Sequence, residues 1–250
     1  MNFFFEAAIN WVSDLWRSPA KCVSMGNDGD YVILMHALAK TSFSLRALAT
    51  ALSDEGYIVI NVDYPSRKYN IEDLSEKFLA KIVKKSCANN KKRIHFVGSS
   101  LGAIVIRKYL QDHPQLSTGR VVQIAPPNRG SEVVDFMLSN AVLGKVFKWF
   151  FGPAAMQLGA KKSSYVNQQL KKEMKCDVGV IAGDCCINPI ASLIIKGESD
   201  GRVSIVNTKV KGMKDQVVVH SPHCFIASNS ECIKQVSYFL SYGQFYHGGE

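Results

Sequence analysis

Two short segments of the sequence place a serine in the pattern Gly-x-Ser-x-Gly, which is typical of a nucleophile presented by a sharp strand-to-helix turn. Residues 98–102 (GSSLG) follow the apolar run IHFV and open LGAIVIRKYL, which has helical periodicity. Residues 197–201 (GESDG) are followed by RVSIVNTKV, which has no helical pattern. Context therefore favours Ser100 as the nucleophile, with Ser99 as its nearest competitor.

A serine hydroxyl needs a general base before it can attack a carbonyl group. Four histidines follow Ser100, at positions 113, 220, 223 and 247. His223 lies in the loop SPH beyond an apolar strand, where a base can reach over the edge of a sheet, whereas His220 ends that strand. The sequence favours His223 as the base and leaves His220 as the alternative.

The base in turn needs a carboxylate that orients its ring. Asp200 lies in a glycine-flanked turn between Ser100 and His223, in the chain order that this kind of turn predicts. Asp184, which follows another apolar run, and Glu198 remain rivals. We therefore predict Asp200 as the orienting acid.

Two backbone amides must bind the oxyanion that forms when such a serine attacks. The residue after the nucleophile, Leu101, begins a predicted helix, whose dipole also favours negative charge. The second amide is expected from the loop after the first apolar strand, at Leu38 or Ala37. His36, which begins this loop, precedes the serine and is expected to form hydrogen bonds within the loop rather than act as a base.

Apolar strands alternate with amphipathic helices along the whole chain, which predicts βαβ units and a mostly parallel sheet flanked by helices. No linker or repeat divides the sequence, so we expect one α/β domain over residues 31–250. The predicted strands are 31–35, 57–62, 93–97, 120–125, 178–182 and 216–220, and the predicted helices 42–54, 71–86, 101–111 and 230–241.

Two segments depart from this alternation. Residues 133–170 are rich in aromatic side chains and contain no readable strand, so they form helices that either cover the sheet or make a lid-like insertion over an apolar pocket. Residues 1–30 are interpreted as an amphipathic helix and a lead-in. That helix either packs on the domain or lies at a membrane surface, because its Trp and Phe side chains share one face.

The composition is that of an ordinary globular protein, with 47% hydrophobic and 20% charged residues among 250, which excludes a disordered or fibrous chain. The net charge of +9 favours acidic surfaces as partners. The basic runs lack a nucleic-acid-reading motif, so no nucleic-acid partner is expected. The seven cysteines contain no CxxC pair, so neither a disulfide framework nor a metal site is expected, and a cytoplasmic location is the simplest interpretation.

The chain resembles the α/β-hydrolase superfamily, and within it the small lipases and esterases. The resemblance implies that Ser100, Asp200 and His223 form a catalytic triad, with Leu38 and Leu101 as oxyanion donors. Relatives usually carry glycine where this chain has Ala37, and Pro222 before the late histidine is also unusual. The resemblance covers most of the chain and rests on YVILMH-A-L, YIVINVDYPSR, HFVGSSLGA, VVQIAPPNRGSEV, SDGRVSI and SPHCFI.

These observations together predict a serine hydrolase that cleaves carboxylic esters through an acyl-enzyme without a cofactor. We expect His36, Ala37, Phe147 and Phe150 to border a substrate with an apolar acyl chain, which an anionic membrane could present. An acyltransferase or a thioesterase would use the same triad. A non-catalytic binding protein on this fold is the alternative from a different class.

Overall fold

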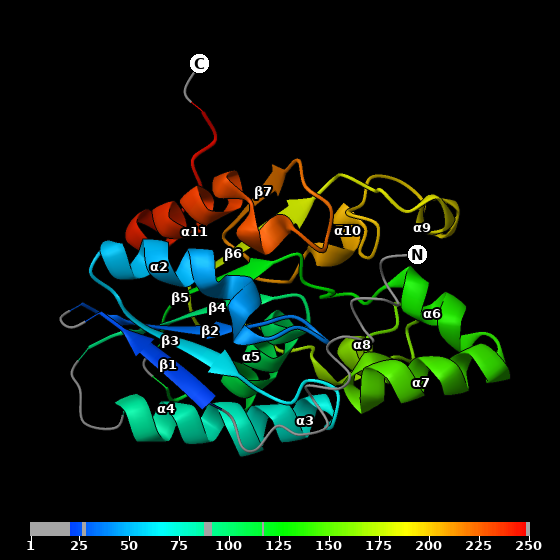
Figure 1. The fold of residues 1–250 in the computed structure, drawn as a ribbon, viewed down its shortest axis with the longest axis horizontal. Coiled ribbons are helices and arrows are strands. Elements are labelled where there is room, and N and C mark those ends of the chain that lie inside the picture. The colour runs from blue at the N-terminus through cyan, green and yellow to red at the C-terminus, as the bar shows by residue number, and fades with distance from the viewer. Residues whose placement is uncertain (1–20, 27–28, 88–91, 117, 249–250) are drawn as a thin grey trace.

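A seven-stranded sheet forms the centre of the protein in the computed structural model, with the strand order β1-β3-β2-β4-β5-β6-β7 (Figure 1). The structure describes residues 21–26, 29–87, 92–116 and 118–248, so the predicted helix near the N-terminus lies outside the described residues. The strands are β1 (Lys21–Met25), β2 (Tyr31–Met35), β3 (Ile58–Asp63), β4 (Ile94–Ser99), β5 (Thr118–Ile124), β6 (Val178–Gly183) and β7 (Asp215–Val219).

Strands β2 to β7 are parallel, which confirms the predicted mostly parallel sheet. All residues of β2 and β4 are buried, as expected for strands covered on both faces. β1 pairs antiparallel with β3, from Lys21 opposite Asp63 to Met25 opposite Val59. It lies in the lead-in 1–30, so the sheet contains an edge strand that the sequence analysis did not predict.

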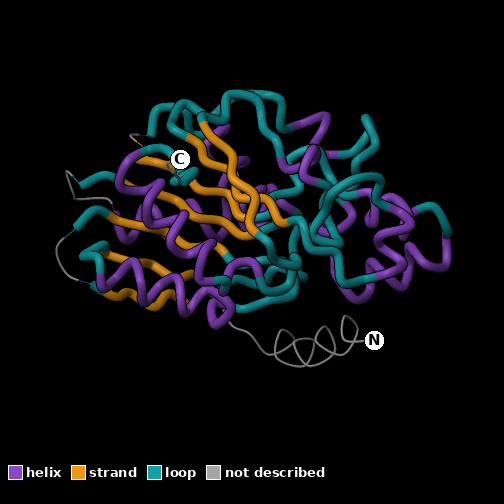
Figure 2. Tube along the Cα trace, turned by 90° about the horizontal axis from the view of Figure 1, so that it is seen from above, coloured by secondary structure: helices purple, strands orange, loops and turns teal. Residues whose placement is uncertain are grey.

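Helices cover both faces of the sheet, which gives three layers (Figure 2). One face of β2 packs its Ile33 and Met35 in a core with side chains from α4 and α5, and the other face packs Val32 and Leu34 with α2 and α11. The helical segments up to the end of β5 are η1 (Ser42–Leu45), α2 (Arg46–Asp54), α3 (Ile71–Asp73), the π-helical η2 (Leu74–Leu79), α4 (Ala80–Cys87) and α5 (Leu101–Asp112). Those after it are α6 (Glu132–Leu138), α7 (Ala141–Met156), α8 (Tyr165–Gln169), α9 (Pro189–Ile194), α10 (Ile205–Thr208), η3 (Ile226–Ser228) and α11 (Ser230–Tyr242).

The segment 133–170 is helical and extends past the carboxyl ends of the strands as α6, α7 and α8 (Figures 1 and 2). α7 bends at Gly152, whose φ of 76° is left-handed, and Pro153 follows it. A Cβ at Gly152 would lie 1.7 Å from the carbonyl oxygen of Arg67, so only glycine allows this approach of α7 to the loop after β3. This bend fixes the direction of the rest of α7 relative to the sheet.

None of the helices in the described ranges is both long and apolar enough to cross a bilayer. Five cysteines of the described part, Cys176, Cys185, Cys186, Cys224 and Cys232, have free thiols. Cys232 of α11 is buried in the core, whereas the adjacent pair Cys185 and Cys186 is only half-buried.

Candidate active site

Ser100 occupies a tight turn between β4 and α5. Its backbone has φ 51° and ψ −114°, a conformation that a residue with a Cβ rarely adopts. The turn is held by the Ser100 amide, which donates to the carbonyl oxygen of Ile124 on β5 at 2.8 Å. Strain of this kind is concentrated at functional positions, and here it places the serine between strand and helix at the carboxyl edge of the sheet.

The two glycines of the motif allow the turn to close. A Cβ on Gly98 would lie 2.4 Å from the amide nitrogen of Ala103, and a Cβ on Gly102 would lie 2.2 Å from the carbonyl oxygen of Met35. Either contact would push α5 away from the sheet, because backbone atoms cannot move aside as a flexible side chain can. The motif thus reflects the close packing of α5 on β4 and β2.

His223 lies between Ser100 and Asp200 and contacts both. Its Nε2 is 3.0 Å from the Ser100 Oγ, and its Nδ1 is 2.6 Å from Asp200 Oδ2. The carboxylate can only accept, so Nδ1 carries the proton and Nε2 accepts the hydrogen bond from the serine hydroxyl. The side chains of His223 and Asp200 are 5% and 0% exposed, so water competes little for these bonds.

Asp200 is fixed by the turn that carries it. Its Oδ1 accepts from the amides of Arg202 and Val203, each at 2.9 Å, which leaves Oδ2 for the histidine. Its carbonyl oxygen accepts from the His223 amide at 3.0 Å, so the acid and base loops are joined through the backbone as well. The second Gly-x-Ser-x-Gly match is therefore the turn that presents the acid, and its Ser199 is buried beside it.

The competing candidates lie elsewhere. His220 pairs through Nδ1 with Asp184 Oδ1 at 2.9 Å, and its side chain is 81% exposed. The two rivals thus pair with each other rather than with Ser100. Glu198 is exposed, and Ser99 lies within β4.

The loop after β2 and the first residue of α5 provide the candidate oxyanion amides. Among the described residues, no hydrogen-bond acceptor pairs with the amides of Ala37, Leu38 or Leu101, so these donors remain available to a ligand. The next amide, that of Ala39, donates to the Ser66 hydroxyl at 3.0 Å, and Ala39 itself has a left-handed φ of 56°. Ser66, which the sequence analysis did not single out, therefore holds the shape of this loop.

His36 is fully buried, and its ring forms hydrogen bonds that stabilise the loop after β2. Its ring stacks on that of Tyr64 at a centroid distance of 4.1 Å, and its Nε2 accepts from the Tyr64 amide. Its Nδ1 lies 2.8 Å from the carbonyl oxygen of Ala37, and the Tyr64 hydroxyl donates to the carbonyl oxygen of His36 at 2.6 Å. His36 was expected to border a substrate, but its ring has no exposed surface.

No known family model and no curated protein sequence matches the chain. Comparison of structures finds many matches. The mature lipase BlEst2 from Bacillus licheniformis superposes with a TM-score of 0.69 at 16% identity, covering 90% of this chain and 99% of that one. The chain has an α/β-hydrolase fold.

Other solved structures with this hydrolase fold carry related activities. Phospholipase PlaB from Legionella pneumophila matches with a TM-score of 0.66 at 15% identity, over 87% of this chain and 60% of that one. The type II thioesterase YbtT of the yersiniabactin pathway matches with a TM-score of 0.60 at 13% identity, over 90% of this chain and 99% of that one. The fold prediction is thereby confirmed, and the activity is a separate question.

A buried network supports the strand ends of the hydrolase fold on the β5 side. Arg107 of α5 donates to the carbonyl oxygen and to Oδ1 of Asn128, at 3.0 and 3.2 Å, and also to the carbonyl oxygen of Leu170. Asn128 in turn donates to Gln123 Oε1 at 2.6 Å and to the carbonyl oxygen of Thr208 at 2.8 Å. Burial lowers the pKa of Arg107 to about 10, so the side chain remains charged at neutral pH. No signal in the sequence marks this arginine, which looks like one more surface cation of an amphipathic helix.

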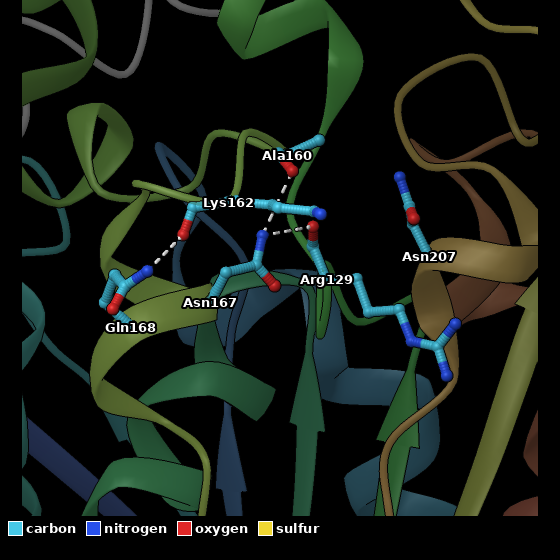
Figure 3. Close-up of a pocket in the computed structure, with 6 residues that line it drawn as sticks. All are labelled: Arg129, Ala160, Lys162, Asn167, Gln168 and Asn207. Carbon is cyan, nitrogen blue, oxygen red and sulfur yellow. Dashed lines mark hydrogen bonds between the residues drawn. The ribbon is translucent and has the colours of Figure 1, made fainter.

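A cavity of about 460 Å³ opens beside the loop after β5, and Figure 3 shows its lining. Asn167 donates to the carbonyl oxygens of Arg129 and Ala160, and Gln168 donates to that of Lys162, so these amides fix the cavity wall. None of the triad residues lines it, and neither do Phe147 or Phe150. Phe147 is buried against Phe151, with the ring centroids 5.0 Å apart, and Phe150 is half-buried.

No group of three or more His, Cys, Asp or Glu side chains within the described ranges is arranged to hold a metal ion.

Proposed function

We propose that the protein is a serine hydrolase that cleaves carboxylic esters, with Ser100 as nucleophile, His223 as general base and Asp200 as the orienting acid. The observation that carries this proposal is the continuous hydrogen-bonded arrangement of the three side chains, at 3.0 and 2.6 Å, on a strained strand-to-helix turn. The esterases, lipases and thioesterase that share the fold support the same reaction class.

In the first half of the reaction, Ser100 Oγ attacks the acyl carbon while His223 Nε2 takes the hydroxyl proton. The resulting imidazolium is stabilised by the Asp200 carboxylate, which is held in place by its own two backbone donors. The amides of Leu101 and of Leu38 or Ala37 bind the oxyanion. His223 then gives the proton to the leaving alcohol, and an acyl-serine remains.

In the second half, His223 removes a proton from water, which attacks the acyl-serine, and the acid is released as Ser100 regains its proton. An apolar acyl chain is the substrate group that the α7 region favours, because Val142, Val146 and Trp149 leave a large apolar surface exposed on this side of the protein. Equal rates on lipid dispersions and on short soluble esters would contradict this choice of acyl chain.

Labelling with a fluorophosphonate probe tests the mechanism before any substrate is known, because the probe reacts only with an activated serine. Wild type and Ser199→Ala are expected to label, and Ser100→Ala is expected to remain unlabelled. If folded wild type stays unlabelled, with and without detergent, the protein is a binding protein on a hydrolase fold and the proposal is wrong.

A thioesterase or an acyltransferase would form the same acyl-serine, and the likeness to YbtT makes thioesters the second substrate class to test. The choice between water, an alcohol and a thiol as the other partner depends on access to the acyl-serine rather than on the triad. Initial rates on matched acyl esters and acyl thioesters, each with and without an added alcohol, separate the three activities. Hydrolysis of the ester series at the highest rate is the expected result.

A further inference from the structure

Large apolar side chains are exposed together at the end of the molecule where the strands of the sheet finish. Leu193 of α9 is 87% exposed and Trp149 of α7 is 61% exposed. α6 packs against both of these helices, so the three helices lie together at this end of the molecule (Figure 1), and we treat their exposed apolar side chains as one surface. We call this surface the α7/α9 face; its members are Phe136, Val142, Leu143, Val146, Trp149, Ile187, Ile190 and Leu193.

Helix α7 presents its apolar residues in the manner of a helix that lies in an interface. Val142, Val146 and Trp149 recur at spacings of four and three residues, which places them on one side of the helix. Lys145 and Lys148 lie beside this stripe and are exposed, while Phe147 on the opposite side is buried in the domain. An apolar stripe bordered by lysines, with a tryptophan in it, is typical of helices that bind at a lipid surface.

The charge of the same two segments has a single sign. Residues 136–172 hold six lysines and residues 185–197 hold one, and neither segment contains an aspartate or a glutamate. The nearest acids of α6 are engaged inside the protein, since Asp135 accepts from the Ala160 amide at 3.0 Å and Glu132 from Asn207 at 2.8 Å. Lys145 and Lys148 therefore give the α7 side of the face a positive charge, whereas Asp184, which pairs with His220, and the exposed Glu198 flank the α9 segment.

This combination favours a bilayer over a second copy of the chain. A symmetric dimer would place the face against itself and bring its lysines together, which costs free energy. An anionic bilayer offers both hydrocarbon for the apolar side chains and negative headgroups for the lysines. We infer that the α7/α9 face docks the protein on anionic lipid membranes and turns the carboxyl edge of the sheet, which carries Ser100, toward the bilayer.

Vesicle flotation with phosphatidylcholine, alone and mixed with phosphatidylglycerol, tests the inference. Wild type is expected to bind the mixed vesicles and to bind the neutral ones more weakly. Val146→Ser/Trp149→Ser is expected to weaken binding by at least about tenfold, and Lys145→Gln/Lys148→Gln by about fivefold for each lysine. In the background Trp11→Phe/Trp16→Phe, Trp149 is the sole tryptophan, and brominated lipid is expected to quench it.

Matched controls separate this face from general hydrophobicity, charge and folding. Val218→Ser/Tyr242→Ser removes side chains of similar exposure, 44% and 65%, on β7 and α11, and it is expected to bind as wild type does. Lys84→Gln/Lys85→Gln on α4 removes the same charge elsewhere. The face variants are expected to keep their melting temperature and their reaction with the fluorophosphonate probe.

Docking does not depend on the proposed reaction, so Ser100→Ala is expected to bind vesicles as wild type does even though it does not label. Undiminished vesicle binding by Val146→Ser/Trp149→Ser, or an absence of Trp149 quenching, would overturn the inference. A concentration-dependent dimer that this double variant abolishes, without vesicle binding by wild type, would overturn it in favour of a second copy as the occupant.

Discussion

Asp200 determines which nitrogen of His223 carries the proton, and its replacement by asparagine isolates that role. In Asp200→Asn the amide group donates toward Nδ1, which favours the tautomer with its proton on Nε2, and Nε2 can then no longer accept from Ser100. We expect kcat for ester hydrolysis to fall by about 10⁴-fold. Asp184→Asn, which alters the exposed pair with His220, is the matched control and is expected to retain activity.

Gly102 and Gly144 are both helical glycines, and alanine is expected to have opposite effects at the two positions. At Gly102 the added Cβ would lie 2.2 Å from the Met35 carbonyl oxygen, and overpacking of this kind costs about 1–3 kcal/mol. At Gly144 the nearest atom is 3.7 Å away, so alanine gains helix propensity of up to about 1 kcal/mol. Urea denaturation of both variants measures the change in the free energy of unfolding, which is expected to be negative at Gly102 and positive at Gly144. Equal destabilisation at both positions would contradict the packing argument.

The sequence places Ser100 correctly in the strand-to-helix turn because that turn has a local signature: an apolar strand, two glycines and a helix. The choice between His223 and His220 depends on three-dimensional distances that the sequence does not contain. Ser66 and Tyr64 carry no such signal, because a hydroxyl that forms one hydrogen bond with the backbone of a loop has no distinctive sequence pattern.

At the scale of elements, Arg107 joins α5 to the loop after β5 and to the start of the segment before β6. Arg107→Met would leave the carbonyl oxygens of Asn128 and Leu170 buried without their donor. We expect the free energy of unfolding to fall by about 2–4 kcal/mol, measured by urea denaturation. Lys108→Met on the next position, whose ammonium pairs with Asp112 near the surface, is the control and is expected to change stability by less than about 1 kcal/mol.

The elements that the sequence predicts well are those with a strong repeat. The strand expected at 31–35 is β2 to the residue, and the helix expected at 230–241 is α11 with one residue more. β1 escapes prediction because KCVSM is short and borders on polar residues, and its place at the sheet edge comes from pairing with β3. The helices α9 and α10 are not predicted from the sequence either, because segments of four to six residues are too short to show a helical period.

At the scale of the whole molecule, His95 makes stability depend on pH. Burial lowers the pKa of its ring, although Asp30 acts in the opposite direction, and its Nδ1 accepts from the Arg120 amide at 2.9 Å. Below the ordinary histidine pKa of about 6.5, the unfolded chain takes up a proton that the folded chain does not. The free energy of unfolding therefore falls as pH drops below that value, and this contribution is fully present above it.

His95→Asn keeps an acceptor near the Arg120 amide and cannot titrate. Urea denaturation from pH 7.5 to 5 is expected to show a shallower loss of stability in this variant, by up to about 1.4 kcal/mol per pH unit. Identical slopes in variant and wild type would show that His95 does not contribute. The comparison at pH 7.5, where the ring is neutral in both states, measures the cost of the substitution itself.

The net charge of +9 is visible in the sequence, but its distribution is a property of the fold. Lys145 and Lys148 of α7 are far along the chain from Lys196, which follows α9, and the packing of α6 on α7 and α9 brings these segments to one end of the molecule. The sequence can therefore predict an acidic partner, and only the structure indicates the surface that would meet it.

Phe245 and His247 hold the segment after α11 at the edge of the sheet opposite Ser100. Asp215, the first residue of β7, accepts from the Phe245 amide at 2.8 Å and from His247 Nε2 at 2.9 Å, and the described C-terminal residues leave the domain there (Figure 1). A biotin handle attached at this end would hold the protein on a sensor chip in one orientation, with the triad and the α7/α9 face directed to the flowing solution. The same geometry makes a C-terminal fluorescent protein a suitable reporter, because its bulk would lie away from whatever the opposite edge binds.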